Sequence, residues 1–180
     1  MSGLVRSLAV LMVLTALVLA PRPGGQPADA ARHPTMKLEG VPSEAALVDR
    51  FLEALRKNDA AALHDLRVTD AEYLGVILPG SVEPGQPLRA WRPDANQYFW
   101  GILDTKSRYS EINLLEQFGG RTYHLKSTEF AKGTKTYATY NAYRQLRLVL
   151  TGEDGEDVRL STGSIAELGG QWKFISFVRE

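Results

Sequence analysis

Residues 146–177, LRLVLTGEDGEDVRLSTGSIAELGGQWKFISF, decide the fold that we predict for this chain. Apolar and polar residues alternate along this stretch, which is typical of strands that cover a core with one face. Two turn signals interrupt the alternation, EDG at 153–155 and GG at 169–170. Because glycine reaches the left-handed backbone conformation of tight hairpins, the stretch predicts antiparallel strands joined by short loops.

The same texture extends back along the chain to residue 122. A third turn signal, KG at 132–133, divides this earlier part. We therefore predict an antiparallel meander of four strands, at 122–131, 134–151, 157–168 and 171–179.

The lengths of the loops predict how these strands pair. A two-residue loop at KG pairs Leu125 with Tyr140, and a three-residue loop at EDG pairs Leu148 with Leu160. Together with a two-residue loop at GG, these registers place one set of apolar side chains on a single inner face: Tyr123, Leu125, Tyr140, Leu146, Leu148, Leu150, Val158, Leu160, Leu168, Ile175 and Phe177.

Amphipathic helices precede the strands. Apolar residues spaced by three and four predict a helix at 43–58 with Ser43 as its N-cap, and a short helix follows at 60–66. The capping box Thr69–Glu72 starts another helix, which ends near residue 78. A long helix is predicted at 94–118, with its buried side formed by Tyr98, Phe99, Ile102, Leu103, Tyr109, Ile112, Leu115 and Phe118.

Helices followed by a one-sided sheet indicate the α+β class, with N-terminal helices packed on a curved antiparallel sheet. The outer face of that sheet is also partly apolar, through Tyr143, Ile165, Phe174 and Trp172. Two explanations stay open at this point. Either the patch forms a homodimer through the sheet face, or the long helix covers it.

The N-terminal segment has the features of an export signal. Arg6 precedes an apolar run at 8–20, and ADA at 28–30 has the small-x-small pattern that signal peptidase cleaves. We therefore expect a cleavable signal at 1–30, a linker at 31–42, and one domain at 43–180 in the periplasm or outside the cell. If the signal stays uncleaved, the domain is instead tethered to the membrane, which is the only membrane association that we expect.

Composition excludes several classes of function. The chain has no cysteine, so disulfides, thiolate zinc sites and a cysteine nucleophile are excluded. The 21 basic and 21 acidic residues balance, which argues against a nucleic-acid partner. His33, His64 and His124 do not have the spacing of metal ligands, and we expect neither a metal site nor a cofactor.

The layout of helices followed by a long meander that ends in GGQWKFISF (169–177) resembles the nuclear-transport-factor-2-like superfamily, also called SnoaL-like or cystatin-like. The resemblance covers residues 43–179, although the long helix at 94–118 departs from it, because the family more often has a short helix or strand there. It implies a cone whose sheet wraps around a pocket closed by helices. Family members include isomerases, dehydratases, polyketide cyclases and non-catalytic binding modules, so the fold does not select the function.

Arg144 is the candidate residue that stands out. The predicted register places it on the apolar face level with Ser164 and near Tyr140 and Tyr123. A buried guanidinium requires a partner or a cavity, so Arg144 is either an anchor for an anionic ligand or a structural ion-pair partner of Glu129 or Asp104. The two tyrosines are either ligand donors or core aromatics, and Trp100 is either part of a lid or core packing.

Two functions follow from these residues. The first is an exported, non-catalytic binding module whose apolar pocket takes a small hydrophobic or anionic ligand, and we favour it because no acid–base pair converges. The alternative is an isomerase, dehydratase or cyclase that acts on a small hydrophobic substrate. Such an enzyme requires a carboxylate in the pocket beside a Tyr or Arg donor, and Glu129 and Asp104 are its candidates.

Overall fold

The computed structural model describes residues 37–90 and 92–179. The signal predicted at 1–30 lies outside this part, and so does most of the predicted linker. Within the described part, no helix combines the length and apolarity that are needed to cross a membrane. Leu38 and Val41 are buried, and Val41 exchanges two backbone hydrogen bonds with Trp172. The packed domain therefore includes the last residues of the segment that we expected to be linker.

The fold is α+β, with helices first and antiparallel strands after them, as the sequence predicted. Helix α1 (Glu44–Lys57) is capped by Ser43, whose hydroxyl accepts a hydrogen bond from the Ala46 amide at 3.1 Å. Helix α2 (Ala60–Asp65) is capped in the same way by Asp59. Both helices lie where the apolar spacing placed them.

The capping box of Thr69 and Glu72 starts α3 (Asp70–Glu72), again as predicted. The helical segment continues as a short π-helix, η1 (Tyr73–Ile77), and ends as α4 (Leu78–Gly80). A single π-helical turn within an α-helix is uncommon, and such turns occur frequently at functional sites. Here it contributes two of the residues that line the cavity described below.

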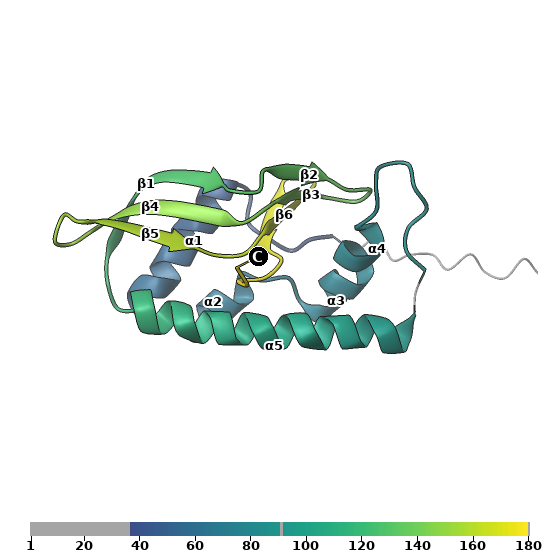
Figure 1. The fold of residues 1–180 in the computed structure, drawn as a ribbon, viewed down its shortest axis with the longest axis horizontal. Coiled ribbons are helices and arrows are strands. Elements are labelled where there is room, and N and C mark those ends of the chain that lie inside the picture. Colours follow the sequence, from purple (N-terminus) through teal and green to yellow (C-terminus); the bar gives the residue numbers. More distant parts are fainter. Residues whose placement is uncertain (1–36, 91, 180) are drawn as a thin grey trace, which may run out of the picture. The chain divides into compact units, whose positions relative to one another are not determined.

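Helix α5 (Pro93–Phe118) confirms the predicted long helix, and it runs below α2 and α3 in Figure 1. The prediction of its buried side was wrong for five aromatic and aliphatic side chains, and the residues that it buries are mostly polar. The reason is that its neighbours on the inside offer a buried arginine and a backbone amide, which require polar partners. The exposed five are Tyr98, Phe99, Ile102, Tyr109 and Ile112, whereas Asn96, Ser107, Glu111 and Leu114 are buried.

The strands form two antiparallel sheets. The first contains β1 (Tyr123–Phe130), β4 (Leu146–Gly152) and β5 (Asp157–Ser161), in the order β1-β4-β5. The second contains β2 (Thr134–Thr136), β3 (Asn141–Tyr143), β6 (Ile165–Leu168) and β7 (Gln171–Phe174), in the order β2-β3-β6-β7. Two of the four predicted strands pass from one sheet to the other, because 134–151 contains β3 and β4 and 157–168 contains β5 and β6. The chain also changes sheet between the first two predicted strands, where β1 leads into β2.

Two of the three predicted loops have the predicted register. Leu148 pairs with Leu160 across the EDG loop, and β6 pairs with β7 across the GG loop. The hairpin predicted at KG was wrong, because Leu125 pairs with Leu150 instead of Tyr140. The chain reverses at residues 137–140 instead. Gly133 does have a positive φ of 67°, but it kinks the chain between β1 and β2 rather than forming a hairpin.

The apolar side chains pack on both faces of the second sheet. Phe174 and Ile165 are fully buried in one cluster with Phe51 of α1. Helix α1 therefore covers the face for which we expected either a homodimer through the sheet or cover by the long helix. On the other face, Ala166 lies in a second cluster with residues of η1, among them Ile77. The prediction of a single inner face was wrong, because its residues are divided between the two clusters. Leu125 belongs to neither cluster and lies exposed on the edge strand β1.

Candidate functional site

A cavity of about 250 Å³ lies between the helical segment 70–80 and the second sheet. We call it the tyrosine cavity, because three tyrosines contribute to its wall. Apolar side chains and serine hydroxyls form most of the remainder, and Arg144 is the one charged side chain among the described residues that line it. The lining residues are Tyr73, Ile77, Leu78, Ser81, Leu103, Tyr137, Tyr140, Ala142, Arg144, Ser164, Ile175 and Ser176.

The turn between β2 and β3 supplies one wall of the tyrosine cavity. Tyr137 and Tyr140 stack there, with their ring centroids 5.0 Å apart. Thr139 fixes the turn to the helical segment, because its hydroxyl donates to the Val76 carbonyl at 3.1 Å. A Cβ atom on Gly80 would lie 1.6 Å from the Thr139 hydroxyl oxygen, so glycine is required for this close approach. The turn that carries the two tyrosines is therefore fixed to the helical segment.

Arg144 lies at the point where the chain passes from β3 into β4. Its neighbour Gln145 has a φ of 56°, which turns the strand out of the second sheet and into the first. The buried Ser164 hydroxyl accepts a hydrogen bond from the Gln145 amide at 3.2 Å. The Arg144 amide donates to the Gly133 carbonyl at 2.9 Å. The backbone that carries the guanidinium is thus held by hydrogen bonds on both sides of the bend.

Burial raises the pKa of two of the tyrosines that line this cavity. Removal from water raises the pKa of the Tyr140 phenol well above its ordinary value, and the neighbouring Tyr137 and Tyr73 add to the shift. Burial also raises the pKa of Tyr73. Both phenols are consequently protonated at physiological pH and can donate hydrogen bonds to a ligand oxygen.

Three of the five predicted site residues line the tyrosine cavity together: Arg144, Tyr140 and Ser164. Tyr123 does not, because the KG register that placed it nearby was wrong. It pairs with Gly152 at the far end of β1 and packs edge-on against Phe118.

Trp100 lies next to the cavity, not in its wall. Its ring is tilted against Tyr73 at a centroid distance of 5.3 Å. Trp100 also lines a second and larger pocket. There the Arg67 guanidinium lies over the indole, with its Cζ atom 5.9 Å from the ring centroid. The tryptophan therefore separates an apolar site from a charged one.

We call the second pocket the charged cleft. Its volume is about 430 Å³, and most of the side chains that line it are ionisable. They come from α2, from the segment that follows it, from α5 and from β7: His64, Asp65, Arg67, Val68, Thr69, Asp70, Trp100, Asp104, Arg108 and Lys173.

The charged cleft is organised around Arg67, which is 3% exposed. Its Nη2 donates to Asp104 Oδ1 at 2.5 Å, and its Nε lies 3.2 Å from Glu111 Oε1. His64 Nδ1 lies 3.4 Å from the same Glu111 carboxylate, and Arg108 pairs with Asp104 at 2.8 Å. Burial raises the pKa of Asp104, but the hydrogen bonds from Arg67 and Arg108 outweigh it and hold the pKa below its ordinary value. Asp104 is thus ionised and engaged by two arginines.

The two carboxylates that an enzyme would require are both away from the tyrosine cavity. Glu129 is exposed on β1, 3.8 Å from Arg147. Asp104 is in the charged cleft, where it is ion-paired. Among the described residues, no three His, Asp or Glu side chains lie close enough together to hold a metal ion.

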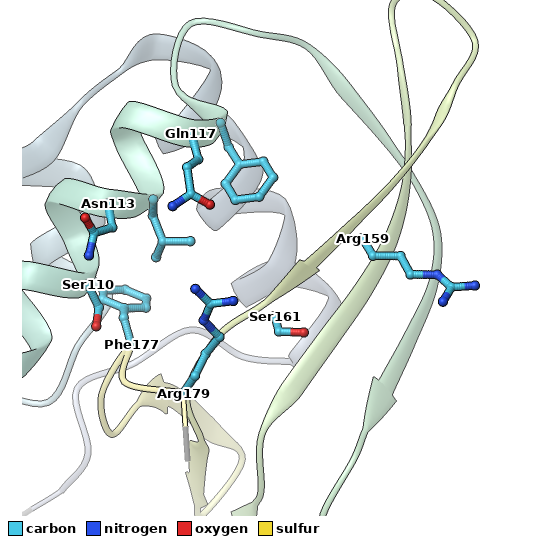
Figure 2. Close-up of a pocket in the computed structure, with 9 residues that line it drawn as sticks. Ser110, Asn113, Gln117, Arg159, Ser161, Phe177 and Arg179 are labelled. Atoms are coloured by element: carbon cyan, nitrogen blue, oxygen red, sulfur yellow. The ribbon is translucent and has the colours of Figure 1, made fainter.

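A third and smaller pocket of about 130 Å³ lies between the C-terminal half of α5 and the last residues of the domain. Figure 2 shows Arg179 pointing into it toward Gln117 and Ser161, whereas Arg159 points away. Its wall is mostly polar, with Ser110 and Asn113 on the helix side. It shares no residue with the tyrosine cavity or with the charged cleft.

Sequence reasoning missed Tyr73 and Tyr137 in the cavity and Arg67 in the cleft. A signal for the tyrosines existed, since Tyr73 directly follows the capping box and Tyr137 is near Tyr140. Arg67 carried no such signal, because its role depends on two residues of α5 far along the chain.

Comparisons with models of protein families, with curated proteins and with solved structures gave no match to this chain. The resemblance to the nuclear-transport-factor-2-like superfamily therefore stays a prediction.

Proposed function

We propose that this protein binds a small ligand in the tyrosine cavity, and that the ligand joins an apolar body to a carboxylate or a similar anionic group. One observation carries the proposal: a single guanidinium, that of Arg144, shares an otherwise apolar and hydroxyl-lined cavity with protonated tyrosines. A guanidinium matches a planar anion, and a neutral phenol donates to its oxygens.

The size of the cavity limits the ligand. Ligand pockets usually span about 300–1,000 Å³, so the volume of about 250 Å³ fits a small molecule only. Aromatic side chains line one end, where Tyr137 and Tyr140 stack. We therefore infer a ligand with a short apolar or aromatic body that packs on these rings while its charged end lies toward Arg144.

The isomerase, dehydratase or cyclase alternative has less support. It requires an acid or base inside the cavity that holds the donor, and the described lining residues include no carboxylate and no histidine. Asp104 and Glu111 are engaged by Arg67 in the charged cleft. We therefore propose binding, not catalysis, at the tyrosine cavity.

The test compares acids with their neutral amides. Phenylacetate and hexanoate, together with phenylacetamide and hexanamide, are titrated into the protein and followed by ligand-observed and protein-observed NMR. We expect the acids to bind more tightly and to shift resonances around Tyr140. Arg144→Gln should weaken binding of the acids about tenfold to a hundredfold, the value of a charge-assisted hydrogen bond, while Arg144→Lys keeps part of the affinity.

Arg147→Gln is the matched control, because Arg147 is an exposed arginine in β4, only three residues further along the chain. It should leave the affinity unchanged. The proposal is wrong if the amides bind as well as the acids, if none of the four compounds binds, or if the control weakens binding as much as Arg144→Gln.

A further inference from the structure

The outer face of α5 carries nearly all of the large hydrophobic side chains that are exposed in the described part of the domain. Among the described residues, six large hydrophobic side chains are exposed, and only Leu125 lies elsewhere. The helix buries polar residues on its inner side, so its apolar residues face away from the core of the same chain. The five that lie on α5 are Tyr98, Phe99, Ile102, Tyr109 and Ile112.

These side chains follow the spacing of a helix that pairs with another helix. Steps of four and three residues connect six exposed positions, which we call the outer seam: Tyr98, Ile102, Thr105, Tyr109, Ile112 and Glu116. Alternating steps of four and three give the 3.5-residue period of a and d positions in a coiled coil. The buried residues Ser107 and Leu114 lie on the opposite side of the helix.

We propose that a second copy of this chain covers the outer seam, with the two α5 helices antiparallel and the two-fold axis at the level of Ser107. This axis places Ile102 opposite Ile112 of the second copy. It also places Thr105 opposite Tyr109, and Tyr98 opposite Glu116, where the phenol can donate to the carboxylate. Each seam residue thus meets a compatible one, as an isologous interface requires.

Charge at the helix ends agrees with the antiparallel direction. Asp94 near the start of α5 and Arg121 just beyond its end are both exposed. The antiparallel register brings Asp94 of one copy near Arg121 of the other, at both ends of the interface. The two helix dipoles also oppose one another in this arrangement, which is the favourable direction.

The apolar area approaches that of a dimer. The four hydrophobic side chains of the outer seam are 37% to 67% accessible, which leaves on the order of 400 Å² of apolar surface at about 200 Å² for a full aromatic side chain. A standard interface buries about 800 Å² per partner, and about 65% of a homodimer interface is apolar. The outer seam therefore supplies most of the apolar area that one copy contributes.

A lipid surface fits this face less well. Helices that lie on membranes carry lysine and arginine along their polar side. Here the outer seam itself contains the acidic Glu116. Arg108, which lies beside the outer seam, is already paired with Asp104 at 2.8 Å and is not available to a lipid phosphate.

The test compares the natural chain with two complementary variants by analytical ultracentrifugation. We expect the natural chain to dimerise at micromolar concentrations. Ile102→Lys and Ile112→Glu alone should each raise the dissociation constant at least about thirtyfold, as for the loss of a central hot spot. When the two variants are mixed, a heterodimer should form, because the introduced lysine then meets the introduced glutamate in one layer while the other layer stays Ile–Ile.

Leu125→Glu is the matched control, since Leu125 is the exposed hydrophobic residue outside α5. It should leave dimerisation unchanged, and all variants should keep the circular dichroism of the natural chain. The proposal is overturned if the natural chain stays monomeric, if the control disrupts the dimer, or if mixing restores nothing. Binding to phosphatidylglycerol vesicles by a monomeric chain would likewise overturn it in favour of a lipid surface.

Discussion

Glu72 is a single residue that connects three separate parts of the chain. Its carboxylate accepts hydrogen bonds from the amides of Thr69 and Glu39, each at 2.7 Å, and from Lys173 Nζ at 2.8 Å. Both members of the Glu72–Lys173 pair are buried. The sequence predicts only the local contact with Thr69, because the capping box is a pattern of neighbours. The other two contacts depend on how the domain closes.

The first residue-scale prediction concerns Lys173→Met. Burial raises the pKa of Glu72, but the hydrogen bonds from Lys173, Thr69 and Glu39 outweigh it, so the folded pKa lies below its ordinary value. This carboxylate therefore stabilises the fold above its unfolded pKa of about 4.3 and loses that contribution as the pH falls through the folded value. Without Lys173, a buried carboxylate has no cation, and the free energy of unfolding at pH 7 should fall by about 3–5 kcal/mol.

The measurement is urea unfolding of both proteins from pH 7 to pH 3. The natural chain should lose stability on acidification, whereas the difference between the two proteins should shrink as Glu72 becomes protonated. Glu53→Gln serves as the control, because the pair of Glu53 with Arg56 is exposed, and its removal should leave the midpoint unchanged. An equal loss in both variants would contradict a role for the buried pair.

At the scale of elements, α5 shows where sequence reasoning fails. Its length and boundaries follow from local signals, and both were predicted. Its orientation was not, because the argument assumed that the apolar stripe of a helix faces the core of its own chain. Ser107 and Glu111 face inward instead, toward the Phe177 amide and Arg67. These partners come from other elements, which a single helical period does not contain.

Ser107→Ala tests this inverted orientation. The Ser107 hydroxyl is fully buried and accepts the Phe177 amide at 2.9 Å, so its loss leaves a buried donor without a partner. We expect a loss of about 1–3 kcal/mol in the free energy of unfolding. Ser110→Ala, one turn along, should cost less than about 0.5 kcal/mol, since that hydroxyl bonds only to its own helix. Equal stabilities for the two variants would mean that α5 is oriented differently.

The strands differ from α5, because the residues of their loops predicted most of the strand pairing correctly. The EDG and GG loops were right, and the same register holds beyond them where Tyr143 pairs with Ile165. Arg144 and Ser164 were therefore placed together correctly. The KG loop failed because a glycine with positive φ suits a kink between sheets as well as a hairpin. That error moved Tyr123 into the predicted site and left Tyr137 out of it.

At the scale of the whole molecule, the domain is stable without disulfides, since the chain has no cysteine. A domain of this kind suits an oxidising compartment without requiring it. The N-terminal segment is what favours export, through the apolar run at 8–20 and ADA at 28–30. We therefore propose that the mature protein begins at Ala31.

Intact mass measurement of the protein from a secreting host tests this cleavage. We expect a soluble chain with the mass of residues 31–180, because signal peptidase selects small side chains at the two alanines of ADA. Replacing both Ala28 and Ala30 by leucine should block cleavage and shift the protein to the membrane fraction, since the apolar run then stays attached. A full-length natural chain in the membrane would show a tether instead of a cleaved signal. A full-length chain in the cytosol would refute export altogether. The distinction also bears on α5, because a dimer of tethered domains forms at a much higher local concentration than one in solution.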